Sequence, residues 1–360
     1  MRPVHYLGIF IPVAVALELA HADPVFVFSA AALGVIPCAA VMGESTEAIA
    51  ARTGPGIGGL LNVTFGNAPE LIIAFFALIE GLQEVVKASI VGSIIGNVLL
   101  VMGAAMLVGG LPREKQTFSR TAANAQSAML LLALAALIFP AIFQLIHGGG
   151  LPAVGDERVD FGSDLEKLSF GVAIVLLLSY GAGLIFSLKT HRAVFNPYGD
   201  EHEEQAHHWP VRRASLFLAI SAVLVGLMSE ILVGSISEAS EDIGLSEFFV
   251  GVFVVAIVGN AAEHWVAVLV AAKDKMDLAV NIAIGSSAQI ALFVAPMLVL
   301  CSFVFGPEPM ALVFNGYELG ALLFAVLIAN LVTQEGESNW FEGVQLLALY
   351  AVLGLVFYFA

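Results

Sequence analysis

Long apolar runs separated by short polar segments dominate the chain from one end to the other. A helix needs about 20 predominantly apolar residues to cross the roughly 30 Å hydrocarbon core of a bilayer. Dividing the chain at its polar segments predicts an all-α polytopic membrane protein with eleven transmembrane helices. The predicted helices cover residues 4–21, 24–43, 57–80, 86–110, 121–146, 168–189, 211–236, 246–272, 278–304, 309–333 and 341–359.

Composition agrees with this pattern and narrows the function. The chain is 59% hydrophobic and 12% charged, which excludes a soluble globule. Its 14 basic and 30 acidic residues give a formal charge of −16, which argues against nucleic acid as a partner and favours cations. Cys38 and Cys301 lie far apart in apolar runs, so neither a disulfide framework nor a Cys-rich metal site is expected. We expect no tightly bound cofactor.

Basic residues predict the orientation in the lipid bilayer, because short cytoplasmic loops collect Lys and Arg. Eleven basic residues lie at the N-terminus or after even-numbered helices, and three, Lys87, Arg158 and Lys167, lie after odd-numbered ones. This distribution predicts a cytoplasmic N-terminus and a C-terminus on the opposite side, in a cytoplasmic membrane of the bacterial type. The first segment also has features of a cleavable signal peptide, and that alternative is left open.

An internal repeat is the most informative feature. Three motifs of the first half recur 193 or 194 residues later. The pairs are Glu44-Ser-Thr-Glu47 with Glu238-Ala-Ser-Glu241, Gly66-Asn-Ala-Pro-Glu70 with Gly259-Asn-Ala-Ala-Glu263, and Gly92-Ser93 with Gly285-Ser286. An odd number of predicted helices separates the copies, so the two halves should be inserted in opposite orientations, as in many secondary transporters. We therefore predict an extra N-terminal helix (1–23), a first half (24–190), a cytoplasmic linker (191–210) and a second half (211–360).

Two glutamates lie near the centres of their predicted spans. Glu70 is 13 residues into the span 57–80, and Glu263 lies at a similar depth in 246–272. An ionisable group at that depth costs several kcal/mol unless it faces a protein cavity or is neutralised, so both are candidates for a functional site. A role as protonated hydrogen-bonding struts between helices is the alternative.

Oxygen-bearing residues surround both glutamates, as a hard cation such as Ca²⁺ requires. Asn67 and Asn260 precede the glutamates by three positions and share a helix face with them. Gly66, Gly259 and Pro69 should loosen the helix there and expose carbonyl groups. The helix after each motif adds further polar side chains, which either coordinate the ion or hydrogen-bond between helices. These are Ser93, Asn97, Ser286 and Gln289.

Two carboxylates that face each other also form a proton site, because empty and desolvated they repel. A divalent cation would displace the protons, so the site would hold either Ca²⁺ or H⁺. Such competition is a mechanism for antiport, with Ca²⁺ as transported substrate and H⁺ as counter-ion.

The paired Gly-Asn-Ala-Pro-Glu and Gly-Asn-Ala-Ala-Glu-His motifs, each followed one helix later by Gly-Ser, resemble those of the calcium/proton antiporters (CAX type) of the cation/calcium exchanger superfamily. The similarity covers about 24–359. It implies that Glu70 and Glu263 bind Ca²⁺ and protons alternately. It also implies ten helices in two inverted five-helix halves, plus an extra N-terminal one.

Other polar residues carry weaker expectations. His264 follows Glu263, and either takes part in proton coupling or bonds a neighbouring helix. Glu230 lies several residues inside the seventh predicted helix and is a candidate relay carboxylate. Two acidic pairs either line vestibules that attract cations or are solvated helix ends. They are Glu44 with Glu47, at the inner end of the second helix, and Glu238 with Glu241, at the outer end of the seventh.

The predicted linker combines acids with histidines, a mixture whose charge changes near neutral pH. The family resemblance implies a segment here that senses Ca²⁺ or pH, and a plain solvated linker is the alternative. Its candidate residues are Asp200, Glu201, His202, Glu203, Glu204, His207 and His208.

Three other functions are alternatives to Ca²⁺/H⁺ antiport. A sodium-coupled exchanger of Ca²⁺ or another divalent cation is the main alternative, although Gly-Asn stands in both motifs where sodium exchangers of the superfamily typically carry Gly-Thr-Ser. A channel would need a continuous pore. An enzyme is disfavoured, because the chain has neither a phosphate-binding loop nor a recognisable nucleophile with its base. Whether the chain forms a homo-oligomer is left open.

Overall fold

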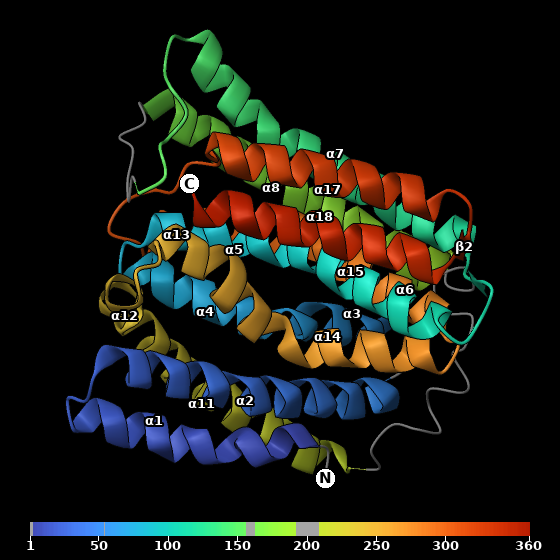
Figure 1. Ribbon diagram of the computed structural model, residues 1–360, viewed down its shortest axis with the longest axis horizontal. Helices are drawn as coiled ribbons and strands as arrows, with labels where there is room; N and C mark the ends of the chain where they lie inside the picture. Colours follow the sequence, from blue (N-terminus) through green and yellow to red (C-terminus); the bar gives the residue numbers. More distant parts are fainter. Residues whose placement is uncertain (1–2, 54, 156–162, 192–208) are drawn as a thin grey trace. The chain divides into compact units, whose positions relative to one another are not determined.

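The computed structural model describes residues 3–53, 55–155, 163–191 and 209–360, and almost all of its regular structure is helical (Figure 1). Within these residues, nine helices are long and apolar enough to cross a membrane, and Val4–Leu19 and Ala68–Ile79 are shorter apolar helices. Each of the eleven predicted segments overlaps apolar helix, and the third is divided in two at Asn67.

The described elements follow one another along the chain as a series of helices with one pair of short strands. In order they are η1 (Pro3–Ile9), α1 (Phe10–Leu19), α2 (Pro24–Thr53), α3 (Pro55–Gly66), α4 (Ala68–Ile79), α5 (Gln83–Ile95), η2 (Gly96–Val101), α6 (Met102–Gly110), β1 (Gln116–Thr117), α7 (Arg120–Ile146), α8 (Ser163–Ile185), η3 (Phe186–Thr190), α11 (Val211–Gly234), α12 (Ile236–Ile243), α13 (Glu247–Phe249), η4 (Val250–Val255), α14 (Ala256–Ala272), α15 (Met276–Gln289), η5 (Ile290–Val294), α16 (Ala295–Ser302), α17 (Gly316–Thr333), β2 (Glu337–Ser338) and α18 (Trp340–Tyr358). The first, η1, is a 3₁₀-helix, and η2 to η5 are π-helical.

Several element boundaries differ from the predicted ones. The second predicted helix was expected to end at residue 43, but α2 continues to Thr53. Its polar residues do not end it, because the hydroxyls of Ser45 and Thr46 donate to the carbonyls of Val41 and Met42 one turn earlier. In contrast, α17 begins at Gly316, later than predicted, where Asn315 and Glu318 form a capping box.

Lys87 and Lys167, which were expected in loops, lie near the beginnings of helices instead. Lys87 is the fifth residue of α5, and Lys167 is the fifth residue of α8. Arg158 lies outside the described residues. The orientation therefore stays a prediction.

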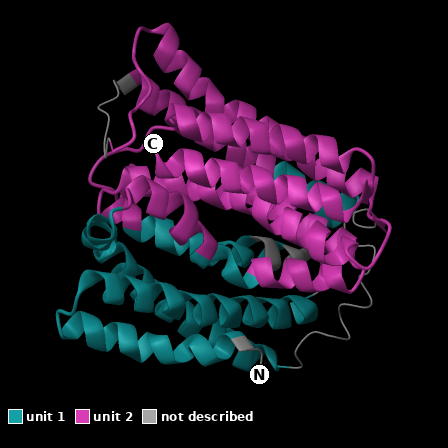
Figure 2. Ribbon diagram, viewed as in Figure 1, with its two compact units in different colours: residues 1–76, 181–244, 258–262 teal, residues 77–180, 245–257, 263–360 magenta. Residues whose placement is uncertain are grey.

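The described chain forms two compact units, which are coloured separately in Figure 2. Residues 1–76, 181–244 and 258–262 form the first, and residues 77–180, 245–257 and 263–360 form the second. Each unit therefore combines segments from both predicted halves of the sequence, and the division into halves stays a prediction.

In the first unit, the long helix α2 packs along α11 and also contacts α1 and α3. One buried cluster joins Cys38 and Met42 of α2 to Val225 of α11. Apolar packing of this kind holds the 30-residue α2 in a fixed rotation about its axis, so that Glu44 is buried while Glu47 is exposed.

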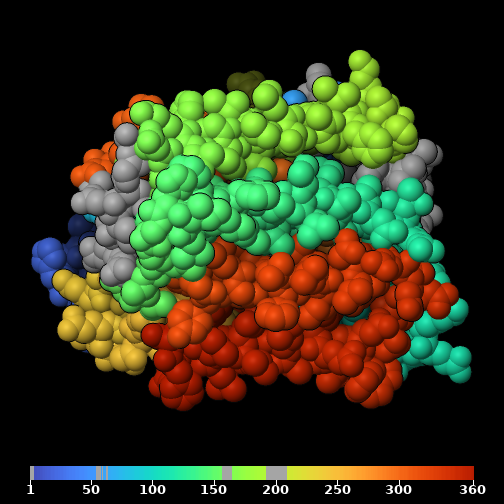
Figure 3. All heavy atoms as spheres, turned by 90° about the horizontal axis from the view of Figure 1, so that it is seen from above, coloured from blue at the N-terminus to red at the C-terminus, as the bar shows by residue number. Residues whose placement is uncertain are grey.

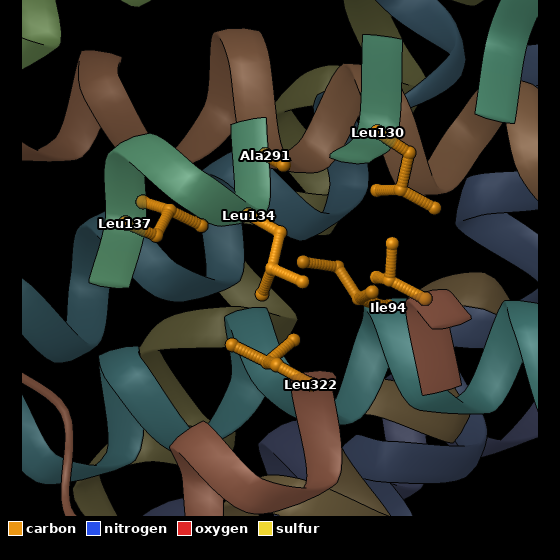
Figure 4. Close-up of a pocket in the computed structure, with 7 residues that line it drawn as sticks. Ile94, Leu130, Leu134, Leu137, Ala291 and Leu322 are labelled. Carbon is orange, nitrogen blue, oxygen red and sulfur yellow. The ribbon is translucent and has the colours of Figure 1, made fainter. Parts of the chain in front are cut away.

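In the second unit, α5, α7, α15 with η5, and α17 meet in a dry apolar interior. Figure 4 shows Ile94, Ala291 and Leu322 facing leucines of α7, around a gap that is too small to hold a water molecule. The α7 leucines are Leu130, Leu134 and Leu137. This packed layer is part of the support for α5 and α15, the helices that carry the predicted polar ligands.

A glycine of α5 allows the close approach of this helix to η4. A Cβ atom at Gly92 would overlap the carbonyl oxygen of Val252 and the Cβ of Ala256. On α15, the Ser287 hydroxyl donates to the carbonyl of Ile94 at 3.5 Å, and this bond joins α15 to α5. These contacts fix the position of α5 on two sides.

Outward-facing residues of the second unit are largely apolar. Figure 3 looks onto a face where α7, in green, lies beside the orange helix α17. Exposed apolar side chains on these helices include Phe139 and Leu145 of α7 and Phe324 and Leu331 of α17. Such a surface suits contact with lipid hydrocarbon.

Loops at one end of the second unit are joined by polar contacts and a small sheet. Strands β1 and β2 pair antiparallel, with Gln116 opposite Ser338 and Thr117 opposite Glu337. An ion pair of 3.2 Å between Arg113 and Asp274 joins the segment after α6 to the loop after α14. The helices that carry the site are thereby connected at their ends.

Candidate cation-binding site

The first motif interrupts a membrane helix. Helix α3 ends at Gly66, Asn67 forms a turn, and α4 begins at Ala68. Pro69 is the second residue of α4, where its missing N–H group is tolerated because the first turn of a helix has no acceptor for it. The expected irregularity at this motif is therefore confirmed.

The two polar side chains of this motif are buried. Asn67 has no exposed surface, and Glu70 is 8% exposed. Glu70 also lies in the first turn of α4, where the helix dipole favours a negative charge. The local fold thus places an amide and a carboxylate within one turn of each other inside a membrane segment.

The second motif lies in a continuous helix. Gly259, Asn260 and Glu263 all belong to α14, and Asn260 is fully buried while Glu263 is partly exposed. Gly259 was expected to loosen the helix, and α14 continues through this position without interruption. Ala262 stands where the first motif has Pro69, so every N–H group needed for the helical ladder is present.

Gly259 has another role, which is to admit Glu70. A Cβ atom built at Gly259 would lie 3.3 Å from Cγ of Glu70 and 3.9 Å from its Cα. The glycine of the second motif therefore packs directly against the glutamate of the first. Gly259 and Glu70 both belong to the first unit, so the two copies of the motif meet there.

In the second unit, α15 holds the carboxylate of α14. The hydroxyl of Ser286 donates to Oε2 of Glu263 at 2.7 Å. Ser286 is itself 7% exposed, so the donor side of this bond is shielded from bulk water. A hydrogen bond to an ionised acceptor is stronger than one between neutral groups and favours the charged form of the carboxylate.

His264 bonds a neighbouring element instead of standing alone. Its Nε2 lies 3.1 Å from Oδ1 of Asn97 in η2. Because an amide oxygen only accepts, Nε2 carries the hydrogen. His264 therefore links α14 to η2, the continuation of α5. The bond from Ser286 links α14 to α15.

π-Helical turns occur beside these polar residues at matching places in the two repeats. Ser93 and Asn97 lie at the junction of α5 with η2, and Gln289 is the last residue of α15 before η5. The elements η2 and η5 begin at residues 96 and 290, an offset of 194. π-Helical segments often occur at functional sites because they displace side chains relative to a regular helix.

The remaining predicted residues lie elsewhere. Glu230 is exposed on α11. Glu44 and Glu47 were expected at the end of their helix, but α2 continues for six residues beyond Glu47. Both glutamates therefore lie within the helix. Glu238 and Glu241 lie on the separate helix α12, because α11 ends at Gly234. All seven linker candidates, from Asp200 to His208, fall outside the described residues.

His5 lies beside one of the predicted acidic residues, which the sequence did not predict. Its Nε2 lies 3.5 Å from a carboxylate oxygen of Glu44, whose side chain is buried. No periodicity signals this contact, because η1 and α2 are brought together by tertiary packing. The only indication available was an isolated histidine in an apolar segment.

Fold and site together define a polytopic helical membrane protein with carboxylate, amide and hydroxyl groups buried in its spans. The model of the sodium/calcium exchanger protein family matches residues 24–189 and 214–359. The chain belongs to this family, and the resemblance drawn from the paired motifs is confirmed.

Several relatives are similar to this chain over nearly their whole length. The chain is 44% identical to the Ca²⁺/H⁺ antiporter of Aphanothece halophytica, over 98% of this chain and 95% of that protein. It is 43% identical to the Ca²⁺/H⁺ antiporter ChaA of Bacillus subtilis, over 97% and 96%. Among solved structures, native YfkE is similar with a TM-score of 0.82 and 39% identity, over 98% of both chains.

Proposed function

We propose that the protein exchanges Ca²⁺ for H⁺ across its membrane by alternating access, with Glu70 and Glu263 binding Ca²⁺ or protons in turn. Two relatives that align over nearly their whole length are named Ca²⁺/H⁺ antiporters, which supports the pair of ions. The observation that carries the proposal is the setting of Glu70. It is a buried carboxylate at an interrupted membrane helix, packed against the glycine of the second motif.

Charge supports competition between the two ions. Two carboxylates bring two negative charges, which either one Ca²⁺ or two protons neutralise. An unneutralised pair in a membrane segment is strongly unfavourable, so release of one ion favours binding of the other. Exchange is therefore coupled without an energy source other than the ion gradients.

Neighbouring oxygens complete the proposed site. Asn67 and Asn260 supply buried amide oxygens one turn before the glutamates. Backbone carbonyls at Gly66 and Gly259 and the side chains of the following helices are the further candidates. Those side chains are Ser93, Asn97, Ser286 and Gln289, and Ca²⁺ commonly takes six to eight oxygen ligands of these types.

We also propose roles for residues outside the ion-binding site. His264 acts in proton coupling through its bond to Asn97. Glu230 is a candidate relay, and Glu44, Glu47, Glu238 and Glu241 attract cations to the two vestibules. The acidic and histidine-rich linker senses Ca²⁺ or pH. The proposed location is the cytoplasmic membrane of a bacterial-type cell, with the N-terminus in the cytoplasm.

Sodium-coupled exchange is the second candidate, because the family is named for sodium/calcium exchange. Uptake of ⁴⁵Ca²⁺ into sealed liposomes of the purified protein separates the two. A pH gradient and a sodium gradient are each imposed as the only driving force. Uptake with the pH gradient supports the proposal, and uptake with sodium alone moves the protein to the second candidate.

The same assay tests the residues. Glu70→Gln and Glu263→Gln keep the side-chain shape but remove the charge and the titratable proton, so each should abolish uptake. Glu18→Gln, at an exposed glutamate of α1, is the matched control and should retain it. Normal transport in both site variants would show that the ion binds elsewhere.

A further inference from the structure

A second group of titratable side chains lies at the beginning of α5, away from the two motifs. Glu84 and Lys87 belong to α5, and Glu318 belongs to the first turn of α17. The charge of Lys87 acts on both glutamates, and that of Glu84 acts on Glu318. All three lie in the second compact unit, where α5 contacts α17.

The two carboxylates are shielded from water. Glu84 is 9% exposed and Glu318 is 2% exposed. Glu84 accepts a hydrogen bond of 2.7 Å from the N–H group of Gly155 and lies in the first turn of α5, so this bond and the helix dipole favour its ionised form.

Glu318 is in a different position. Its Oε2 accepts a hydrogen bond of 2.8 Å from the N–H group of Asn315. Its Oε1 is buried and has no hydrogen-bond partner within the part of the chain that the structure describes. Burying an ionised oxygen without a partner is far more costly than burying the neutral carboxyl group.

Charge counting shows what the cluster needs. Two carboxylates and one ammonium leave one negative charge in a place with little water, so a further positive charge is required. A metal ion would be repelled by the ammonium of Lys87, and a proton would not need added space. The charged residues on neighbouring segments, Glu247 of α13 and Glu308, are acidic, so they cannot supply that positive charge.

We propose that Glu84, Lys87 and Glu318 form a second proton-binding site, in which Glu318 holds one proton while Glu84 pairs with Lys87. The site is separate from the transport site, because Ser93 lies nine positions after Glu84 in α5, which is about 13 Å along a helix. This inference does not depend on the proposed ion exchange. It adds a proton that the protein carries without releasing it for Ca²⁺.

Infrared spectroscopy of the full-length protein in detergent tests the site directly. A protonated carboxyl group gives a carbonyl stretching band, which an ionised carboxylate lacks, and the band shifts in D₂O. The measurement uses the Glu70→Gln/Glu263→Gln variant as background, so that the transport glutamates do not contribute. We expect one band component in this background that is lost on adding Glu318→Gln.

The decisive variant is Glu84→Gln. It removes one negative charge without touching Glu318, so Lys87 alone then balances Glu318 and the band component should again be lost. Lys87→Met should have the opposite effect and increase the band, because both carboxyl groups then take up protons. A purely structural ion-pair network with Glu318 ionised predicts no such component in the background.

Helix capping needs its own control, because Glu318 also caps α17. Glu342 forms the same capping box with Asn339 at the beginning of α18, and both of its oxygens accept hydrogen bonds. Glu342→Gln should leave the Glu318 band component unchanged. If Glu318→Gln does not fold, Glu84→Gln decides alone. A band component that is absent from the background, or that persists in Glu84→Gln, would overturn the proposal.

Discussion

Gly259 and Glu70 come from the two copies of one repeated motif, and they pack against each other. The glycine leaves room for the glutamate side chain, because a Cβ atom at position 259 would lie 3.3 Å from Cγ of Glu70. In the first copy the corresponding glycine, Gly66, ends a helix instead. The same residue type therefore serves a different purpose in each half.

Replacing Gly259 by Ala should weaken Ca²⁺-coupled transport without unfolding the protein. The added methyl group displaces Glu70 by a few tenths of an ångström, and overpacking of this kind costs about 1–3 kcal/mol. We expect the apparent Ca²⁺ affinity to fall by about tenfold, and further in Gly259→Val. Titration of ⁴⁵Ca²⁺ uptake measures it. Gly171→Ala is the control, because a Cβ atom there meets nothing within 4 Å, and equal loss in both variants would argue against a specific effect on Glu70.

Removing the Ser286 hydroxyl should change the balance between Ca²⁺ and protons. Ser286 donates to Oε2 of Glu263, and this bond favours the ionised carboxylate that Ca²⁺ requires. In Ser286→Ala the proton competes better, so Ca²⁺ binding should need a higher pH. A hydrogen bond to a charged group is worth about 1.5–3 kcal/mol, which corresponds to a loss of roughly tenfold or more in apparent affinity at acidic pH.

Ser287→Ala is the matched control for this shift. Its buried hydroxyl donates to backbone carbonyls of Ala283 and Ile94 and not to a carboxylate. The pH profile of ⁴⁵Ca²⁺ uptake should therefore keep its midpoint in Ser287→Ala. If Ser286→Ala also keeps the wild-type midpoint, the hydroxyl has no part in the competition.

Some structural features could be predicted from the sequence and others could not. Membrane segments were predictable because each is a continuous apolar run, and the interruption at Asn67 was predictable because Gly66 and Pro69 flank it. The end of α2 was not. Glu44 and Glu47 suggested a boundary, but helix-favouring residues and back-bonded hydroxyls carry the helix to Thr53.

Contacts between helices could not be predicted from the sequence, for a physical reason. Bonds from Ser286 to Glu263 and from His264 to Asn97 depend on how each helix is rotated about its axis. Asn97 also lies within the π-helical turn η2, which the sequence of that segment does not predict. The residue types of the candidate site were therefore predictable, while its partners were not.

Gly92 should be essential for stability and not for ion chemistry. A side chain at this position would overlap the Val252 carbonyl, so α5 and η4 would have to move apart. We expect Gly92→Ala to lower the free energy of unfolding by about 3 kcal/mol, at the upper end for overpacked positions, and to lower the Tm. Thermal unfolding of the purified protein measures this. Gly320→Ala, where a Cβ atom meets nothing within 4 Å, should leave the Tm close to that of the wild type.

The bond between His264 and Asn97 should appear as an energetic coupling between the two positions. His264→Ala and Asn97→Ala each break the same contact, so the double variant should lose less than the sum of the two single losses. We expect a coupling of about 1 kcal/mol, or roughly fivefold in the apparent Ca²⁺ affinity. The four proteins of this cycle are compared by ⁴⁵Ca²⁺ titration. Additive losses would mean that the contact does not contribute to binding, and His264 would then act, if at all, independently of Asn97.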